Sequence, residues 1–431
     1  MLRSVRETKP AARALAAKVL AACGLTLLLL AAPRAAAQQY VYATSYFGVA
    51  EEDEDPTLHG VMRIDLSTGI ASTFVPEGAA GMSFPNDIAV GPHDGNLYVA
   101  AGRNILRFSG VDGSPMGAAG NDPGVFARFS FLNGPQSLLF EEDGTLYAST
   151  LTGGVATFDP MGDRGASLAN GLVLPGGMAF APGGGIAVDV GNFSTFGDGG
   201  VELIKDGQVT TLVTRDQDPE EFNGATSLAY TRAPGDYDGD GTVTSADHDV
   251  WVDAFGTNDP AADGNGDGVV DAADFTVWRD HLGETARLLA TDFLGNKIVS
   301  FALDGSDLTE WAVTPPEIPD PLPDGVDEQY ASNFPSGMTV TDGGTVLVST
   351  MGLTRRPDNR GAILEYDFDG NLLRVVADGL PAMTSIALAL PATPPALAAV
   401  PEPHALALGV LSLMAIRLRR SNRPTRRESA F

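Results

Sequence analysis

A hairpin pattern that returns along the chain constrains its fold more than any other feature. In the clearest copy, residues 84–101, a short apolar strand, a polar turn and a second strand follow one another, which is the order expected of a β-hairpin. Three further copies run without interruption through residues 134–150, 175–190 and 334–350. Each copy is followed by a second pair of short apolar segments, so the repeating unit contains four predicted strands.

Two more copies are each divided between distant parts of the sequence. The fifth has its strands at residues 224–232 and 286–293, and the sixth has them at residues 381–390 and 39–47. Four strands recurring every roughly 40 to 55 residues is the spacing of propeller blades. We therefore predict an all-β fold, a six-bladed β-propeller closed by pairing between its N-terminal and C-terminal strands, which leaves no exposed sheet edge there. The alternative is a β-sandwich of unrelated hairpins.

The first 37 residues have the order of a secretory signal peptide. Basic residues come first, an apolar run over residues 19–32 follows, and Ala35-Ala36-Ala37 supplies a small-residue cleavage site. Lipoprotein-type cleavage at Cys23 is the competing interpretation. Cys23 is the single cysteine, so the chain beyond residue 37 has no disulfide, and its stability must come from closure of the ring and from metal. We expect an exported protein.

The charge of the chain argues against one class of partner. The whole sequence carries 27 Lys and Arg against 55 Asp and Glu. Both ends, residues 1–37 and 404–431, are basic, and without them 15 basic residues face 53 acidic ones, a net charge of −38. A surface this acidic repels phosphate backbones, so we expect no nucleic-acid partner, whereas calcium and basic or neutral ligands are compatible with it.

The C-terminal segment has three sorting features in order. A Pro/Ala-rich linker, residues 391–399, leads into residues 400–431, which contain Pro401-Glu402-Pro403, an apolar run at residues 405–416 and six arginines. This order resembles the bacterial PEP-CTERM sorting signal. The resemblance implies recognition by an exosortase, removal of the tail, and delivery to the cell envelope or an extracellular polysaccharide matrix. The apolar run is shorter than the about 20 residues that span a bilayer. A permanent membrane anchor is the alternative.

An acidic stretch in the fifth blade has the ligand spacing of two EF-hand calcium loops. Oxygen-bearing side chains stand at loop positions 1, 3, 5, 9 and 12 of residues 236–247, Gly241 occupies position 6, and the pattern returns 27 residues later. A solvated acidic linker is the alternative, and two matches in one register argue against it. We predict two calcium ions, with Thr242 and Val269 contributing backbone carbonyls. The predicted ligands are Asp236, Asp238, Asp240, Thr242, Thr244 and Asp247 in the first loop and Asp263, Asn265, Asp267, Val269, Asp271 and Asp274 in the second.

Each loop leads into a short predicted helix, and Trp251 with Phe255 repeats as Trp278 with Leu282. Because both pairs are spaced i, i+4, we expect the two helices to bury them against each other. The duplicated loop and helix resemble a type I dockerin domain over residues 235–283. The resemblance implies that calcium orders the fold and that loop positions 10 and 11 contact a cohesin-like partner. These positions are Ser245, Ala246, Ala272 and Ala273.

The dockerin-like segment lies inside the predicted propeller, whereas dockerins usually lie at a chain end. Residues 232–285 take the place of a short hairpin turn and divide the propeller into residues 38–231 and 286–390. A domain whose ends lie close together can replace a hairpin tip at little cost. We therefore expect the insertion to project from the propeller face that carries the turns of the inner hairpins.

The start of each inner strand is predicted to line one mouth of the central channel. Asn86 matches a position at which gluconolactonase-like six-bladed enzymes hold a catalytic metal, and the strand plan resembles those enzymes and NHL-repeat proteins. Asp87 stands beside it, but the other positions of the ring offer no carboxylate, so we predict no catalytic residue. The ring is Asn86, Gln136, Gly176, Thr226, Ser336 and Thr384.

Two functions are compatible with the sequence. The first is a calcium-binding docking protein, exported and retained at the envelope or in the matrix, with a carbohydrate or small molecule in the channel and a cohesin-like partner on the calcium module. The second is a lactonase-type or glycan-acting hydrolase carried on a dockerin-mediated extracellular assembly. The missing channel carboxylates favour the first.

Overall fold

The computed structural model describes the propeller and its insertion but neither end of the chain. The predicted signal peptide, the linker and the sorting motif Pro401-Glu402-Pro403 lie outside the described residues. Within the described part of the chain, no helix is both long and apolar enough to cross a membrane. The described residues are 39–45, 60–117, 122–130, 133–191, 200–214, 222, 225–293, 295–314, 333–341, 343–352 and 361–389.

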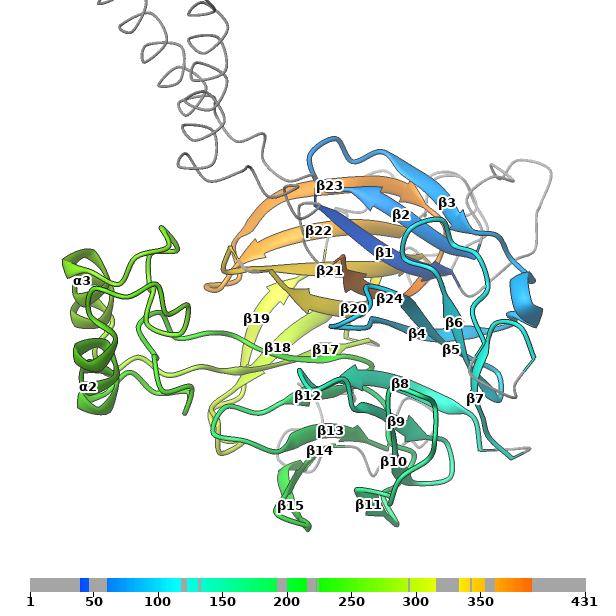
Figure 1. Cartoon of the computed structure of the whole chain (residues 1–431), viewed down its shortest axis with the longest axis horizontal. Coiled ribbons are helices and arrows are strands. Elements are labelled where there is room, and N and C mark those ends of the chain that lie inside the picture. Colours follow the sequence, from blue (N-terminus) through cyan, green and yellow to red (C-terminus); the bar gives the residue numbers. More distant parts are fainter. Residues whose placement is uncertain are drawn as a thin grey trace, which may run out of the picture. The chain divides into compact units, whose positions relative to one another are not determined.

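The strands of the described chain form six four-stranded antiparallel sheets, which are the blades of a propeller (Figure 1). A single 3-10 turn, η1 (Ala79–Gly81), lies between blades 1 and 2. The strands of each blade are given from the inner to the outer strand. Blades 1 and 2 contain β24 (Met383–Leu388), β1 (Tyr40–Ser45), β2 (Val61–Asp65) and β3 (Ala71–Val75), and then β4 (Pro85–Val90), β5 (Leu97–Ala101), β6 (Asn104–Phe108) and β7 (Val125–Arg128). Blades 3 and 4 contain β8 (Pro135–Phe140), β9 (Leu146–Thr150), β10 (Gly154–Phe158) and β11 (Ala169–Asn170), and then β12 (Met178–Phe180), β13 (Ile186–Val190), β14 (Gly200–Lys205) and β15 (Gln208–Thr214). Blades 5 and 6 contain β16 (Leu228–Tyr230), β17 (Leu288–Asp292), β18 (Lys297–Phe301) and β19 (Thr309–Val313), and then β20 (Asn333–Val340), β21 (Thr345–Gly352), β22 (Gly361–Asp367) and β23 (Leu372–Leu380).

The ring is closed by strands from opposite ends of the chain. β1 pairs with β24, with Val41 opposite Leu388 and Thr44 opposite Ser385, and the two strands lie side by side in Figure 1. Each inner strand also contacts the next one around the ring, and β20 of blade 6 contacts β24 of blade 1. The predicted six-bladed propeller with terminal closure is therefore confirmed. Closure pairs edges that would otherwise be open to aggregation.

Apolar side chains fill the spaces between neighbouring blades. Tyr98 of β5 contacts the rings of Phe126 and Phe140 edge-on, at centroid distances of 4.9 and 4.8 Å, and so joins blade 2 to blade 3. β13 is buried along its whole length. Because each blade packs against a neighbour on both faces, its central strands are mostly apolar and buried.

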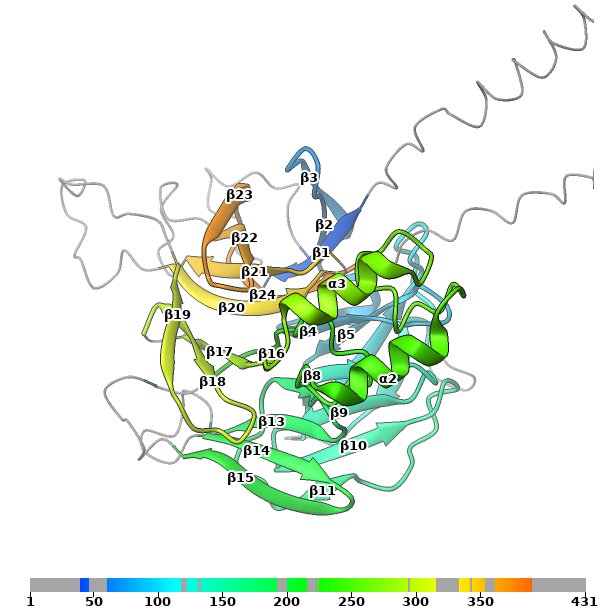
Figure 2. The same ribbon diagram turned by 90° about the vertical axis from the view of Figure 1, so that its left-hand side faces the viewer.

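The insertion connects the two strands of the split hairpin in blade 5. β16 pairs with β17, with Leu228 opposite Ala290, although more than fifty residues separate the two strands in sequence. This pairing confirms the predicted split copy. The chain then carries helices α2 (Ser245–Ala254) and α3 (Ala272–Asp280), which lie beside each other (Figure 2). An isolated bridge between Thr242 and Thr285 holds the base of the insertion together.

Candidate functional site

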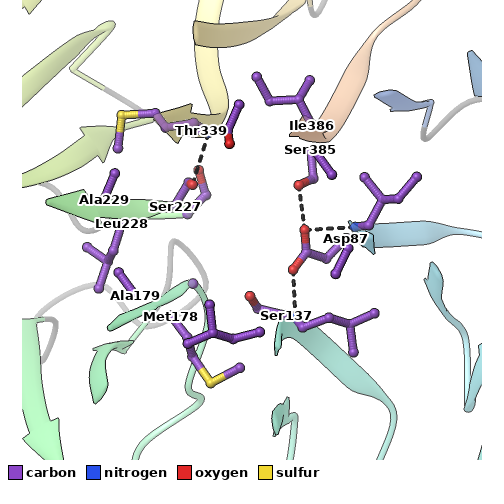
Figure 3. Close-up of a pocket in the computed structure, with 18 of the residues that line it drawn as sticks. Asp87, Ser137, Met178, Ala179, Ser227, Leu228, Ala229, Thr339, Ser385 and Ile386 are labelled. Carbon is purple, nitrogen blue, oxygen red and sulfur yellow. Dashed lines mark hydrogen bonds between the residues drawn. The ribbon is translucent and has the colours of Figure 1, made fainter. Parts of the chain in front are cut away.

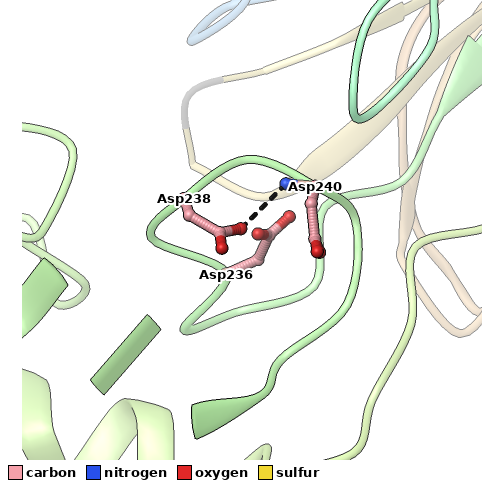
Figure 4. A group of neighbouring side chains, drawn as sticks. All are labelled: Asp236, Asp238 and Asp240. Atoms are coloured by element: carbon pink, nitrogen blue, oxygen red, sulfur yellow. Dashed lines mark hydrogen bonds between the residues drawn. The ribbon is translucent and has the colours of Figure 1, made fainter. Parts of the chain in front are cut away.

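The first predicted calcium loop brings three carboxylates together. Ligand oxygens of Asp236, Asp238 and Asp240 lie within 4.8 Å of one another (Figure 4). Backbone N–H groups orient them, because Asp236 accepts hydrogen bonds from Gly239 and Gly241, both at 2.9 Å. Burial raises the pKa of Asp236; the hydrogen bonds from Gly241 and Gly239 oppose this shift, and the charges of Asp247 and Asp240 add to it.

The carboxylate at position 12 of this loop is held by backbone hydrogen bonds of the loop and of the helix that follows it. Asp247 is fully buried. It accepts backbone hydrogen bonds from Tyr237 and Thr244, both at 2.7 Å, and from Asp238 at 3.0 Å. It also forms a capping box with Thr244 at the start of α2. The helix N-terminus and the loop therefore fix the same side chain.

The second loop repeats this geometry. Asp263 accepts from the backbone N–H of Gly268 at 2.7 Å, and the buried Asp274 accepts from those of Asp271 at 2.7 Å and Asn265 at 3.1 Å. Because Asn265 stands where the first loop has an acid, the close acidic triplet found among the described residues belongs to the first loop. Oxygen donors without sulfur or imidazole suit calcium, and the residues of both loops fit it.

Reciprocal hydrogen bonds join the two halves of the module. The indole N–H of Trp251 donates to the carbonyl of Asp271 at 2.9 Å, and that of Trp278 donates to the carbonyl of Thr244 at 2.6 Å. The backbone repeats the exchange, since Val243 N–H donates to Glu284 and Val270 N–H donates to Thr257, both at 2.9 Å. Each half thus supports the loop of the other.

The expected burial of Phe255 and Leu282 is wrong. Their side chains are 54% and 56% exposed, because α2 ends at Ala254 and α3 ends at Asp280, before the i+4 position is reached. The aromatic contacts between the helices come instead from Trp251, Trp278 and their neighbours His248 and Phe275. The four predicted partner positions are exposed at the first turns of α2 and α3; they are Ser245, Ala246, Ala272 and Ala273.

The module contacts the propeller through its first loop. The N–H of Gly183, in the turn between β12 and β13, donates to the carbonyl of Gly239 at 3.0 Å. Gly241 lies so close that a Cβ there would stand 2.6 Å from Pro182 and 2.8 Å from Leu303. The side chain of Lys205 in turn donates to the carbonyl of Gly183 at 2.7 Å. The turns of blades 4 and 5 therefore support the first calcium loop.

A cavity of about 520 Å³ runs along the inner strands of the propeller (Figure 3). Five of the six predicted ring positions line it, namely Asn86, Gln136, Thr226, Ser336 and Thr384. Three of them donate to the next blade: Asn86 to the carbonyl of Pro135 at 3.2 Å, Thr226 to that of Ser336 at 3.2 Å, and Thr384 to that of Pro85 at 2.9 Å. These polar side chains hold adjacent blades together at this mouth.

The acid beside Asn86 joins three blades. Asp87 of β4 accepts hydrogen bonds from the hydroxyl of Ser385 in blade 1, from the N–H of Leu138 in blade 3 at 2.7 Å, and from its own neighbour Ile88 at 2.8 Å (Figure 3). Burial raises its pKa, and the hydrogen bonds from Ser385 and Leu138 oppose the shift. Both of its oxygens are engaged, so Asp87 closes the ring rather than facing the cavity as a free acid.

A second buried acid, Asp189 of β13, was not singled out from the sequence. One of its oxygens accepts from the N–H of Ala225 at 3.2 Å, and the other has no hydrogen-bond partner among the described residues. Burial raises the pKa of this carboxyl well above its ordinary value. A Cβ at Gly176 would stand 2.8 Å from it. An alignment of the blades could have revealed Asp189, because the other blades carry Ala, Ser or Thr at the corresponding position of the second strand.

Comparisons with known proteins match the chain only at the level of structure. No family model matches the sequence, and no curated protein matches it. One similar structure comes from a crystal structure of a nidogen/laminin complex, with 13% identity and a TM-score of 0.48 over 82% of this chain and 98% of that one. Another is an X-ray structure of a protein provisionally described as a gluconolactonase, with 14% identity and a TM-score of 0.37 over 67% of this chain and 77% of that one. The propeller assignment rests on the strand pairings themselves.

Proposed function

We propose that this chain is an exported, calcium-binding docking protein that carries a ligand in its propeller channel. The observation that carries the proposal is the duplicated loop, in which carboxylates of Asp236, Asp238 and Asp240 lie within 4.8 Å of one another. The reciprocal hydrogen bonds of Trp251 and Trp278 make the two halves one unit. The predicted signal peptide and the predicted sorting signal support a location at the cell envelope or in an extracellular matrix, after processing by an exosortase.

Calcium supplies the charge that the loops lack. Two carboxylates about 5 Å apart repel each other by about 1 to 3 kcal/mol. A divalent cation between the carboxylates would offset this repulsion, and about seven oxygen ligands at about 2.4 Å would complete its coordination. The ion would be held by Asp236, Asp238 and Asp240 in the first loop and by Asp263, Asn265 and Asp267 in the second, with the remaining predicted ligands completing each site.

The docking surface lies at the first turns of α2 and α3. Ser245, Ala246, Ala272 and Ala273 are small and exposed there, so a cohesin-like partner can approach the helix backbone closely. Binding rather than hydrolysis is favoured because Asn86 and Asp87, the amide and the acid of the channel, both form hydrogen bonds between blades. The hydrolase alternative gains no supporting contact from this arrangement.

A capture experiment in calcium tests the proposal. Immobilised protein should retain a specific extracellular partner in calcium, and chelator or the double variant Asp240→Ala, Asp267→Ala should abolish retention. Asp253→Ala is a matched control, because Asp253 is an exposed acid of α2 outside the loops. Retention that survives both the chelator and the double variant would overturn the docking function.

A further inference from the structure

The second mouth of the cavity has an apolar rim. Each inner strand contributes its last residue to this rim, and all six residues line the cavity. Phe180 is the most open of them, with 39% of its surface exposed. The first mouth, by contrast, is polar and its side-chain donors bond to neighbouring blades. The rim residues are Val90, Phe140, Phe180, Tyr230, Val340 and Leu388.

One cation lines this rim. Arg232 lies two residues beyond Tyr230, the last residue of β16, and both residues line the cavity. Arg232 is exposed and forms no ion pair or hydrogen bond within the described part of the chain. The acid that lines the cavity, Asp87, lies in β4 beside Asn86, at the other mouth. The guanidinium is therefore free to bind an anion.

Two aromatic residues of neighbouring blades line the same mouth as this cation. Phe180 ends β12 and Tyr230 ends β16, and these two strands contact each other. The hydroxyl of Tyr230 has no hydrogen-bond partner among the described residues. Burial raises the pKa of Tyr230, so the hydroxyl stays neutral and can donate a hydrogen bond. An apolar face, a neutral donor and a cation thus line the same mouth of the cavity.

We propose that this mouth binds a carboxylate-bearing sugar, with its carboxylate on Arg232 and its ring against Phe180 and Tyr230. A guanidinium matches a carboxylate with two parallel hydrogen bonds. Aromatic faces pack against the apolar face of a sugar ring, and the tyrosine hydroxyl reaches a ring hydroxyl. The cavity has the size of small-molecule sites. The inference rests on the proposed function in that it names the ligand of the same channel.

A single charge on the site selects the ligand class. Arg232 is the one cationic side chain that lines the cavity among the described residues. A doubly charged phosphate would keep one charge that no other cationic side chain of the cavity pairs. A neutral sugar would leave the guanidinium unpaired. A singly charged uronic acid satisfies both the ring surface and the cation.

Calorimetric titration with matched ligands tests this assignment. The ligands are a glucuronate disaccharide, a neutral glucose disaccharide of the same size, and acetate, all at one fixed calcium concentration. We expect the uronate to bind most tightly, Arg232→Gln to weaken it by about ten-fold or more, and Phe180→Leu to weaken it several-fold. Arg103→Gln is the control, because Arg103 is an exposed arginine in the turn between β5 and β6.

Each other outcome has a definite meaning. Equal affinity for the neutral disaccharide, or full affinity in Arg232→Gln with an unchanged thermal midpoint, would overturn the role of the cation. Acetate that binds as tightly as the uronate would overturn the role of the aromatic rim. Titration and partner capture on the unchanged protein separate this inference from the proposed function: uronate binding without partner capture removes only the docking role, and partner capture without uronate binding removes only the channel ligand.

Discussion

The two calcium loops share one sequence plan but have different surroundings. In the first, Gly239 accepts a hydrogen bond from the turn of blade 4, and Gly241 lies against Pro182 and Leu303. At the matching positions of the second loop, a Cβ on Gly266 or Gly268 would meet no atom of the described chain within 4 Å. The two loops therefore repeat the same oxygen-bearing residues, but only the first is packed against the propeller in the described part of the chain.

The cause of this difference is the route of the chain. The first loop begins a few residues after β16, and the segment that leads back into β17 holds it from the other side, where Ala286 N–H donates to the carbonyl of Gly241 at 2.8 Å. The second loop has no such neighbour among the described strands. We therefore expect calcium in the first loop to stabilise the contact with blades 4 and 5, and calcium in the second loop to stabilise the module alone.

Removing calcium should have the largest effect. An ion that binds only the folded state at a thousand-fold excess over its Kd contributes about 4 kcal/mol. Chelator should therefore unfold the module while the propeller remains closed. Fluorescence of Trp251 and Trp278 in a Trp311→Phe background measures this, and near-ultraviolet dichroism follows the propeller. Unchanged tryptophan emission on chelation would contradict calcium-dependent folding.

Paired glycine substitutions should separate the loops. Gly241 and Gly268 both have φ near +90°, so Ala at either position costs about 1 to 2 kcal/mol. Gly241→Ala also overlaps Pro182 at 2.6 Å and should cost about 1 to 3 kcal/mol more. Denaturant unfolding in saturating calcium gives the two free energies of unfolding. Equal losses would mean that the first loop is no more constrained than the second.

Substitution of the same predicted calcium ligand in each loop should show which loop stabilises the adjacent turn of the propeller. Asp240→Ala and Asp267→Ala remove the acid at position 5 of each loop. Only the first should raise hydrogen exchange in residues 181–185, by about three-fold to ten-fold, because that turn bonds to the first loop. Exchange measured by mass spectrometry in calcium tests this, and an equal response to both substitutions would remove the distinction.

The smallest effect is expected from the lysine that supports the turn. Lys205→Met removes one hydrogen bond to the carbonyl of Gly183, worth about 0.5 to 1.5 kcal/mol. Calcium affinity of the first loop should fall about two-fold, and that of the second should not change. Lys297→Met is the control, since Lys297 starts β18 and bonds to neither loop. A loss in the second loop would show that the halves of the module act together.

Local sequence patterns were sufficient to predict the blades of the propeller. Apolar runs and turn residues predicted the hairpins, and the split copies at residues 224–232 and 286–293 pair as expected. The same reasoning failed for Phe255 and Leu282, because helical spacing says nothing about where a helix ends. It named Asp87 but not the hydrogen bond that joins Asp87 to the next blade, and it missed Asp189, which accepts from Ala225.

The sequence by itself determined the number of blades, their closure and the repeated order of oxygen-bearing residues in two loops, because each depends on a spacing along the chain. The tertiary structure alone decided which loop rests on the propeller, which channel side chains bond to a neighbouring blade, and that Arg232, Phe180 and Tyr230 line one cavity. These contacts join residues that are far apart in sequence. Their geometry follows from how the blades pack, and no local pattern encodes it.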